Sequence, residues 1–396
     1  MSFSSLVENH RTLVCVGSGG VGKTTTAAAL ALHGAMTGRR SMVLTIDPAR
    51  RLAQSLGVDS LGSDGERIAP EVLAAAGVDV RGTLSAGMLD QKSAWDEFIA
   101  RHAPSAEARN TILSNEFYQH LSRSFAGSTE YMAIEELCRI HESGLYDLIV
   151  LDTPPTTHAL VFLEAPRRLE DFMDRSIVGW LVKPYLSVGW SAWKTASRTV
   201  RFVVTRIEEA AGARTLAQIS EFFVAMETLF DGITERGRKV RGLLAGPDTA
   251  FILVAGPEEQ VLGESEHLTT KMSELGMPLR GVVMNRIHPL PGAADLGVSF
   301  EELCELLVSE CPALGEMEGS VVEWLASTYM DGCTVARAED VRREVFEAGL
   351  PGDVVLAVVP EFERDVHEIR ALARVAWQIC GAAGEGKVEG PVGRVD

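Results

Sequence analysis

One segment near the start of the chain constrains the fold more than any other. Residues Gly17–Thr24 read GSGGVGKT, which matches the pattern GxxxxGK[ST] of a phosphate-binding loop. The apolar run Thr12–Val16 precedes this segment, and an Ala- and Leu-rich helical pattern over Thr25–Thr37 follows it. Strand, glycine-rich loop and helix in this order are the context that the motif requires, so the sequence predicts a P-loop.

Each part of such a loop has a role in holding a triphosphate. Glycines allow the backbone to curl until successive N–H groups face a phosphate, and the helix N-terminus adds partial positive charge. Lys23 is expected to reach the β- and γ-phosphates, and the Thr24 hydroxyl is expected to bind Mg²⁺. The predicted ligand is therefore Mg-ATP, and its predicted loop contacts are Gly19, Gly20, Val21, Gly22, Lys23, Thr24 and Thr25.

The rest of the chain repeats the alternation of strand and helix. Short apolar runs that are bounded by Gly, Pro or Asp predict further strands at Ser41–Ile46, Asp147–Leu151, Phe251–Ala255, Gly281–Met284 and Val354–Val359. Nearly continuous apolarity is typical of parallel strands that are buried on both faces. Helical patterns separate the runs, for example at Glu130–Glu142 and Glu361–Ile379. The predicted fold class is α/β, with a doubly wound, mostly parallel sheet of the P-loop type and a helical subdomain.

We expect a single ATPase domain over residues 1–380 and a flexible, glycine-rich tail over 381–396. Two stretches, about 85–130 and 165–245, break the alternation, and they are expected to add helices without a strand between them. In the second stretch, apolar residues recur three or four positions apart, as on one face of a helix; they are Leu216, Ile219, Phe223, Met226 and Phe230.

Two acidic residues come at the ends of predicted strands. Ligands of α/β sheets bind outside the carboxyl ends of the strands, so Asp152 is expected to support Mg²⁺, partly through water. Asp47 follows the strand Ser41–Ile46, where a carboxylate near the γ-phosphate can orient the attacking water. A helix N-cap is the alternative for Asp47, and a turn before Pro154 is the alternative for Asp152. The predicted catalytic residues are Lys23 and Asp47.

The charge and composition of the chain disfavour several other classes of protein. The formal charge of 37 minus 55, or −18, repels nucleic acid and anionic membrane, so neither is an expected partner. No apolar run approaches the roughly 18 residues that a membrane span needs, and stable membrane insertion is not expected. The P-loop comes too early to leave room for a signal peptide, and the six cysteines form no CxxC. These features predict a cytoplasmic protein with free thiols.

Three segments together resemble the ArsA / Get-pathway family of P-loop ATPases. They are Gly17–Thr25, Asp47–Leu56, which is similar to the family's switch I, and Asp152–Leu160, which is similar to its switch II. The likeness covers roughly residues 10 to 380, and the stretch Asn115–Glu136 resembles a bacterial ArsA-like branch of the family. The resemblance implies a dimeric Mg-ATPase.

The resemblance also implies roles for residues outside the P-loop. Asp47 would position water, and Asn285 would read adenine beside the later segment that holds Pro360 and Phe362. Switch residues would move with the nucleotide state; in this chain they are Pro48, Thr153, Pro154 and His158.

One departure from the family concerns the mechanism directly. Members of the family usually carry a second lysine after the first P-loop glycine, and this lysine reaches across the dimer to the opposite phosphates. This chain has Ser18 there, and a neutral hydroxyl cannot replace a positive charge on a phosphoryl group. Hydrolysis is then slow, another cation substitutes, or a paralogous partner supplies the lysine. The expected assembly is thus a homodimer or a heterodimer with a paralogous ATPase.

The sequence leaves two alternatives for what the ATPase acts on. The segment Phe172–Trp193 holds half of the six tryptophans, and it forms either a groove for a hydrophobic protein client or part of the internal core, with the core favoured. The other alternative is the ATPase subunit of an arsenite or anion efflux pump. The scattered cysteines give no evident zinc or metalloid site, which disfavours the pump.

Overall fold

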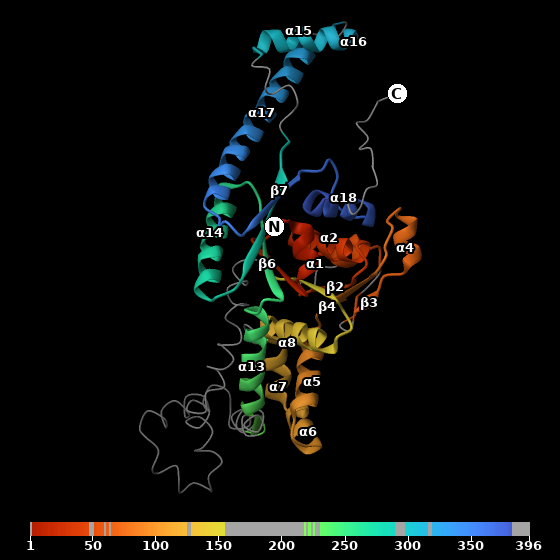
Figure 1. Ribbon diagram of the computed structural model, residues 1–396, viewed down its shortest axis with the longest axis vertical. Coiled ribbons are helices and arrows are strands. Elements are labelled where there is room, and N and C mark those ends of the chain that lie inside the picture. The colour runs from red at the N-terminus through yellow and green to blue at the C-terminus, as the bar shows by residue number, and fades with distance from the viewer. Residues whose placement is uncertain are drawn as a thin grey trace.

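The computed structural model describes residues 2–46, 51–58, 61–62, 65–124, 128–154, 218, 221–222, 225, 230–289, 298–315 and 319–381. Its centre is an eight-stranded sheet in the order β3-β4-β2-β5-β1-β6-β7-β8 (Figure 1). All neighbouring strands are parallel except the pair β3 and β4. The strands are β1 (Thr12–Gly17), β2 (Arg40–Thr45), β3 (Glu66–Arg67), β4 (Thr83–Met88), β5 (Leu148–Asp152), β6 (Thr249–Ala255), β7 (Leu279–Ile287) and β8 (Val355–Pro360).

The six strands predicted from apolar runs are all present, with bounds shifted by one or a few residues. The strand β4 was not predicted, and the expected helix-only stretch from about 85 is wrong where it overlaps this strand. Its sequence TLSAGM is rich in small and polar residues and lacks the β-branched run that marks the others. The four inner residues of β4 are nevertheless buried, because its partner β2 fixes its place in the sheet.

Helices cover both faces of the sheet, which confirms the doubly wound class. One face packs against α1 (Phe3–Asn9), α2 (Lys23–Met36), α3 (Arg51–Ser55), α4 (Pro70–Ala75) and α18 (Ile369–Cys380). The other packs against α5 (Gln91–His102), α6 (Ala106–Ser114), α7 (Glu116–Ser124), α8 (Ser128–Ser143), α13 (Phe230–Leu244) and α14 (Glu259–Glu274). Successive residues of β1, such as Val14 and Cys15, contribute to opposite faces, as the alternation of a strand requires.

The predicted helix Glu361–Ile379 is wrong at its start, because α18 begins at Ile369. The backbone N–H of Glu361 instead donates to the carbonyl of Ile287, at 2.9 Å. The chain after β8 therefore stays tied to the sheet before it turns into the helix.

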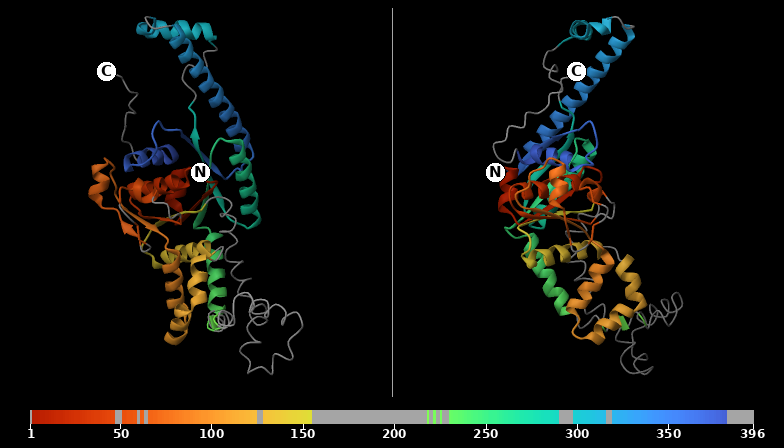
Figure 2. Two further views of the ribbon diagram at one scale, coloured as in Figure 1. Left: turned by 180° about the vertical axis from the view of Figure 1, so that it is seen from behind. Right: turned by 90° about the vertical axis from the view of Figure 1, so that its right-hand side faces the viewer.

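Helices α5 to α8 and α13 form a bundle on one side of the sheet (Figures 1 and 2). An ion network joins α13 to α8: Arg236 binds the buried Glu135 at 2.8 Å and the half-exposed Glu142 at 2.6 Å. Four of these helices lie in or beside the first predicted helical stretch. Of the second stretch, 165–217 and most of 218–229 lie outside the described residues, as do Leu216, Ile219, Phe223 and Met226. The segment Phe172–Trp193 also lies outside them.

An arm of three helices extends away from the bundle, towards the opposite end of the molecule, and it was not predicted (Figures 1 and 2). It consists of α15 (Phe300–Glu310), α16 (Pro312–Gly315) and the 30-residue α17 (Gly319–Ala348) (Figure 2). Large apolar side chains are exposed along it, namely Phe300, Leu306, Trp324, Met330, Val335, Val341 and Val345. No helix in the described part of the chain has the length and apolarity that crossing a membrane requires.

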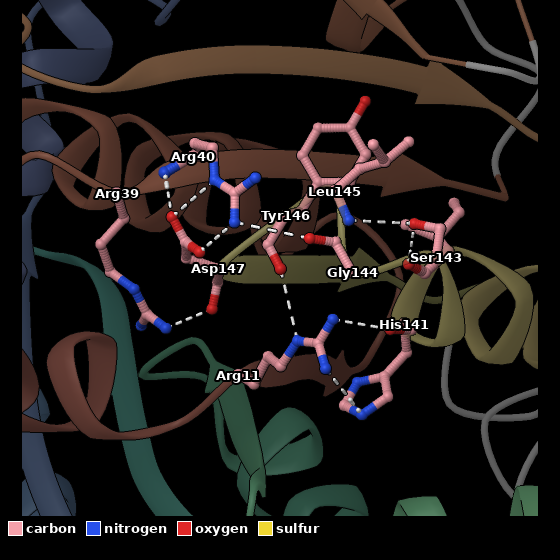
Figure 3. A network of polar contacts seen from close by, with 10 residues as sticks. Arg11, Arg39, Arg40, His141, Ser143, Gly144, Leu145, Tyr146 and Asp147 are labelled. Carbon is pink, nitrogen blue, oxygen red and sulfur yellow. Dashed lines mark hydrogen bonds and ion pairs between the residues drawn. The ribbon is translucent and has the colours of Figure 1, made fainter.

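A polar network holds together the amino ends of the central strands (Figure 3). Arg11 donates to the carbonyls of His141 and Tyr146, and Arg39 donates to the carbonyls of Val7, His10 and Asp147. Arg40 binds the carboxylate of Asp147 through its backbone N–H and its guanidinium. The hydrogen bonds from Arg40 lower the pKa of Asp147 from its ordinary 3.8 to about 2.

This lowered pKa predicts an acid-sensitive contribution to stability. Because the folded pKa lies below the unfolded one, the contribution is present above about pH 4 and is lost as pH falls towards about 2. The carboxylate is 41% exposed, so Asp147→Asn should lower the free energy of unfolding at pH 7 by less than about 1 kcal/mol. Urea titrations at pH 7 and pH 3 check this. A difference between wild type and variant that grows towards pH 3 would contradict the assignment.

Candidate nucleotide site

The glycine-rich loop leaves the carboxyl end of β1, between the ends of β5 and β6. Gly17 has φ +152°, and a Cβ there would lie 2.0 Å from the carbonyl oxygen of Val254 in β6. Gly22 has φ +95°, a left-handed conformation that side chains disfavour. Close strand packing and an αL turn therefore both depend on glycine, which is why this loop can curl as a phosphate cradle.

Lys23 opens α2 and folds back over the loop. Its side chain is buried, at 7% exposure, and its Nζ donates to the carbonyl oxygen of Ser18 at 2.7 Å. The N-cap residue of α2 is Gly22, which has no side chain to cap the first turn. The leading N–H groups of α2 and the ammonium of Lys23 lie at the same helix terminus, an arrangement that favours an anion.

Asp152 ends β5 and lies against the same loop. It is 1% exposed, and its Oδ2 accepts hydrogen bonds from Thr24 Oγ1 at 2.6 Å and from Thr45 Oγ1 at 2.8 Å. Burial raises the pKa of the neighbouring Cys15 thiol; the charge of Asp152 raises it further, while Lys23 opposes the shift. A carboxylate and two hydroxyls make an all-oxygen set, the kind of donor that Mg²⁺ prefers, so these residues fit the ion.

The predicted base-side residues gather at the ends of β7 and β8. Asn285 Nδ2 donates to the carbonyl oxygen of Val21 at 2.8 Å, and a Cβ on Gly22 would lie 2.3 Å from the same Nδ2. Pro360 ends β8 and pairs in register with Ile287 of β7. Phe362 follows in the loop, with the guanidinium of Arg374 5.0 Å above its ring centroid.

The structure thus brings together the loop residues, Asp152, Thr153 and Asn285. Thr153 is buried, and its Oγ1 donates to the carbonyl of Cys15 at 2.7 Å; Pro154 follows it directly. Asp47, Pro48 and His158 lie outside the described residues, so their assigned roles stay predictions. Within the described ranges, no group of three or more His, Cys, Asp or Glu side chains is arranged to hold a metal ion.

Two residues at this site were missed from the sequence. Thr45 is the last residue of β2 and shares Asp152 with Thr24; its place at a strand end beside Asp152 was the available signal. Glu264 lies on α14 and accepts from Ser18 Oγ at 2.6 Å. It stands 246 positions from Ser18, and nothing local marks it.

A doubly wound sheet with this loop, lysine and strand-end carboxylate defines a P-loop nucleotide-binding protein. The sequence profile of the anion-transporting ATPase family matches residues 10–296. The chain therefore belongs to that family, and it is an ATPase.

Relatives with assigned names agree with this placement. The chain is 26% identical to "ATPase GET3" of Malassezia globosa over 334 residues, which cover 84% of this chain and 86% of that protein. It is 25% identical to "ATPase ASNA1 homolog 2" of Paramecium tetraurelia, over 68% of this chain and 74% of that protein. It is 24% identical to "Putative arsenical pump-driving ATPase 1" of Aquifex aeolicus, over 74% of this chain and 67% of that protein.

Proposed function

We propose that this ATPase is a dimeric, Mg-ATP-driven switch that couples its nucleotide state to the binding of a hydrophobic protein client through its helical subdomain. The observation that carries the proposal is the contact between Thr24, at the start of α2, and the buried Asp152, at the end of β5, next to the ammonium of Lys23. Oxygen donors that suit Mg²⁺ thus adjoin a lysine and a helix N-terminus that suit phosphate, which supports the binding of Mg-ATP.

Separate groups of residues are assigned to the phosphates, the base, the magnesium ion and the attacking water. Lys23 and the backbone N–H groups of residues 19–25 bind the phosphates, while Asn285, Pro360 and Phe362 bind the base. Thr24 and Asp152 would hold Mg²⁺, partly through water, and the ion when bound neutralises phosphate charge. Asp47 orients the attacking water, and the switch residues Pro48, Thr153, Pro154 and His158 respond to the loss of the γ-phosphate.

Membership of this family supports the dimer, and the replacement of the family's second lysine bears on whether the two chains are identical. The Ser18 hydroxyl is 3% exposed and bonded to the carboxylate of Glu264, so this position supplies no positive charge to a phosphate. A partner chain that carries the lysine would complete the site, in a heterodimer with a paralogous ATPase. A homodimer with slow turnover is the alternative assembly.

The substitution Ser18→Lys tests whether the missing lysine limits ATP turnover. We expect the pure wild-type protein to turn over slowly, and Ser18→Lys to raise kcat at least about tenfold at protein concentrations where it is dimeric, because the lysine adds charge stabilisation to the transition state. Ser18→Ala is the matched control and should leave kcat low. Fast turnover by the pure wild type would remove the need for a partner's lysine.

Two binding and activity assays distinguish a client-binding switch from the ATPase subunit of a pump. Nucleotide-dependent capture of an apolar helical peptide supports the switch, whereas stimulation of ATP turnover by arsenite supports a pump. The cysteines disfavour the pump, because Cys15, Cys138 and Cys333 are buried and the six cysteines are scattered along the sequence without a recognisable metalloid motif.

A further inference from the structure

The end of β7 carries an unusual backbone turn beside the proposed base site. Arg286 has φ +61°, and in the described part of the chain it is the one non-glycine residue with a positive φ. The pairing of β7 with β8 shifts register at the same place, between Asn285 and Ile287. The chain is therefore held in a strained conformation immediately after Asn285, and surrounding contacts must maintain it.

His288 supplies such contacts. Its backbone N–H donates to Glu339 Oε2 at 2.8 Å, and its Nδ1 lies 2.9 Å from Glu339 Oε1. Its Nε2 lies 2.9 Å from Glu361 Oε2. Each ring nitrogen of His288 therefore lies within hydrogen-bond distance of a carboxylate oxygen, one on either side of the imidazole.

The two carboxylates belong to elements that are far apart in the sequence. Glu339 is on α17 of the arm, and it is 5% exposed. A buried carboxylate is costly unless it is paired, and His288 provides two of its hydrogen bonds. Glu361 stands between Pro360 and Phe362, the two residues proposed to lie beside adenine.

A second bond fixes the same segment. The backbone N–H of Glu361 donates to the carbonyl of Ile287, at 2.9 Å. The segment after β8 is thus bound to the end of β7 through main chain and side chain, and Asn285 on that strand bonds to Val21 of the P-loop. A continuous path of bonded groups runs from α17 through His288 to the base side.

We propose that His288 is a positioning residue for the nucleotide base: Glu339 of α17 fixes the imidazole, and the imidazole fixes Glu361 so that Pro360 and Phe362 face the adenine. The proposal rests on the proposed ATP site. If this is so, the affinity of the protein for the adenine base depends on α17 of the arm. By linkage, nucleotide binding then stabilises the packing of α17 against the sheet.

The test uses the full chain and separates base contacts from phosphate contacts. For His288→Ala we expect KM for ATP to rise about tenfold, because the hydrogen-bonding contacts that hold the base segment are lost, while kcat stays within about twofold. The affinity for inorganic tripolyphosphate, which has no base, should not change. Glu339→Gln keeps the shape of the side chain but replaces one of its two accepting oxygens with an NH₂ donor, which should weaken its hold on His288, so a rise in KM of about threefold is expected.

His367→Ala is the matched control, because His367 is 69% exposed and pairs with Asp365 at 3.5 Å on the same segment. It should leave both ligands unaffected. The proposal is overturned if His288→Ala binds ATP like the wild type, or if it loses ATP and tripolyphosphate equally, which would indicate general damage. Lys23→Ala distinguishes failure of the proposed ATP site from failure of the role proposed for His288. If Lys23→Ala retains wild-type affinity for both ATP and tripolyphosphate, the proposed ATP site itself is contradicted.

Discussion

Lys23→Ala is expected to lower ATP turnover by at least about 10²-fold, because it removes the one side-chain cation of the glycine-rich loop from the phosphates. The ammonium is already placed across the loop, where it donates to the Ser18 carbonyl from a buried position. Its loss should also weaken Mg-ATP binding, measured by calorimetry. Lys271→Ala is the control, because that lysine forms an exposed pair with Glu274 on α14.

Equal affinity of Lys23→Ala and wild type for Mg-ATP would contradict the role of this loop. A variant that has lost its fold would give the same loss of turnover for another reason. Circular dichroism and the urea midpoint of the variant should therefore match those of the wild type before the kinetic result is interpreted.

Asp152→Asn is expected to have a comparable effect on turnover, again about 10²-fold or more, through the metal rather than the phosphate. Asparagine keeps the shape of the side chain and an oxygen that can accept from Thr24 and Thr45, so the fold should persist. It removes the negative charge that would support Mg²⁺. The wild type should bind ATP much more tightly with Mg²⁺ than without it, and the variant should show little difference.

Asp147→Asn is the matched control for this experiment. Asp147 precedes the opposite end of β5 and pairs with Arg40, away from the nucleotide loop. The same chemical change there should leave the Mg²⁺ dependence of ATP binding intact. An Asp152→Asn protein that keeps full Mg²⁺ dependence would show that the ion is held elsewhere.

The parts of this molecule that were predictable from sequence are those that local pattern determines. The P-loop and six strands follow from glycine spacing and from apolar runs within a few residues. Strand β4 was missed because its small residues are buried by the partner strand rather than by their own character. The start of α18 was misplaced because a hydrogen bond from Glu361 to Ile287, distant in the sequence, holds the preceding loop.

The contacts that shape the site were harder to predict because they join distant segments. Ser18 meets Glu264, and His288 meets Glu339, across 246 and 51 positions of chain. Asp152 was predictable, because the end of a buried strand next to a P-loop strand is where this fold binds its ligand. The arm of α15 to α17 gave no such signal, since α17 lacks a single apolar face over its 30 residues.

The most direct test is a crystal structure of the protein with Mg²⁺ and a non-hydrolysable ATP analogue. We expect the triphosphate to lie against the backbone N–H groups of residues 19–24, with Lys23 on its β- and γ-phosphates. The magnesium should lie beside Thr24 and Asp152, and the base should lie against Asn285 and Phe362. A triphosphate bound away from this loop, or a magnesium remote from Asp152, would contradict it.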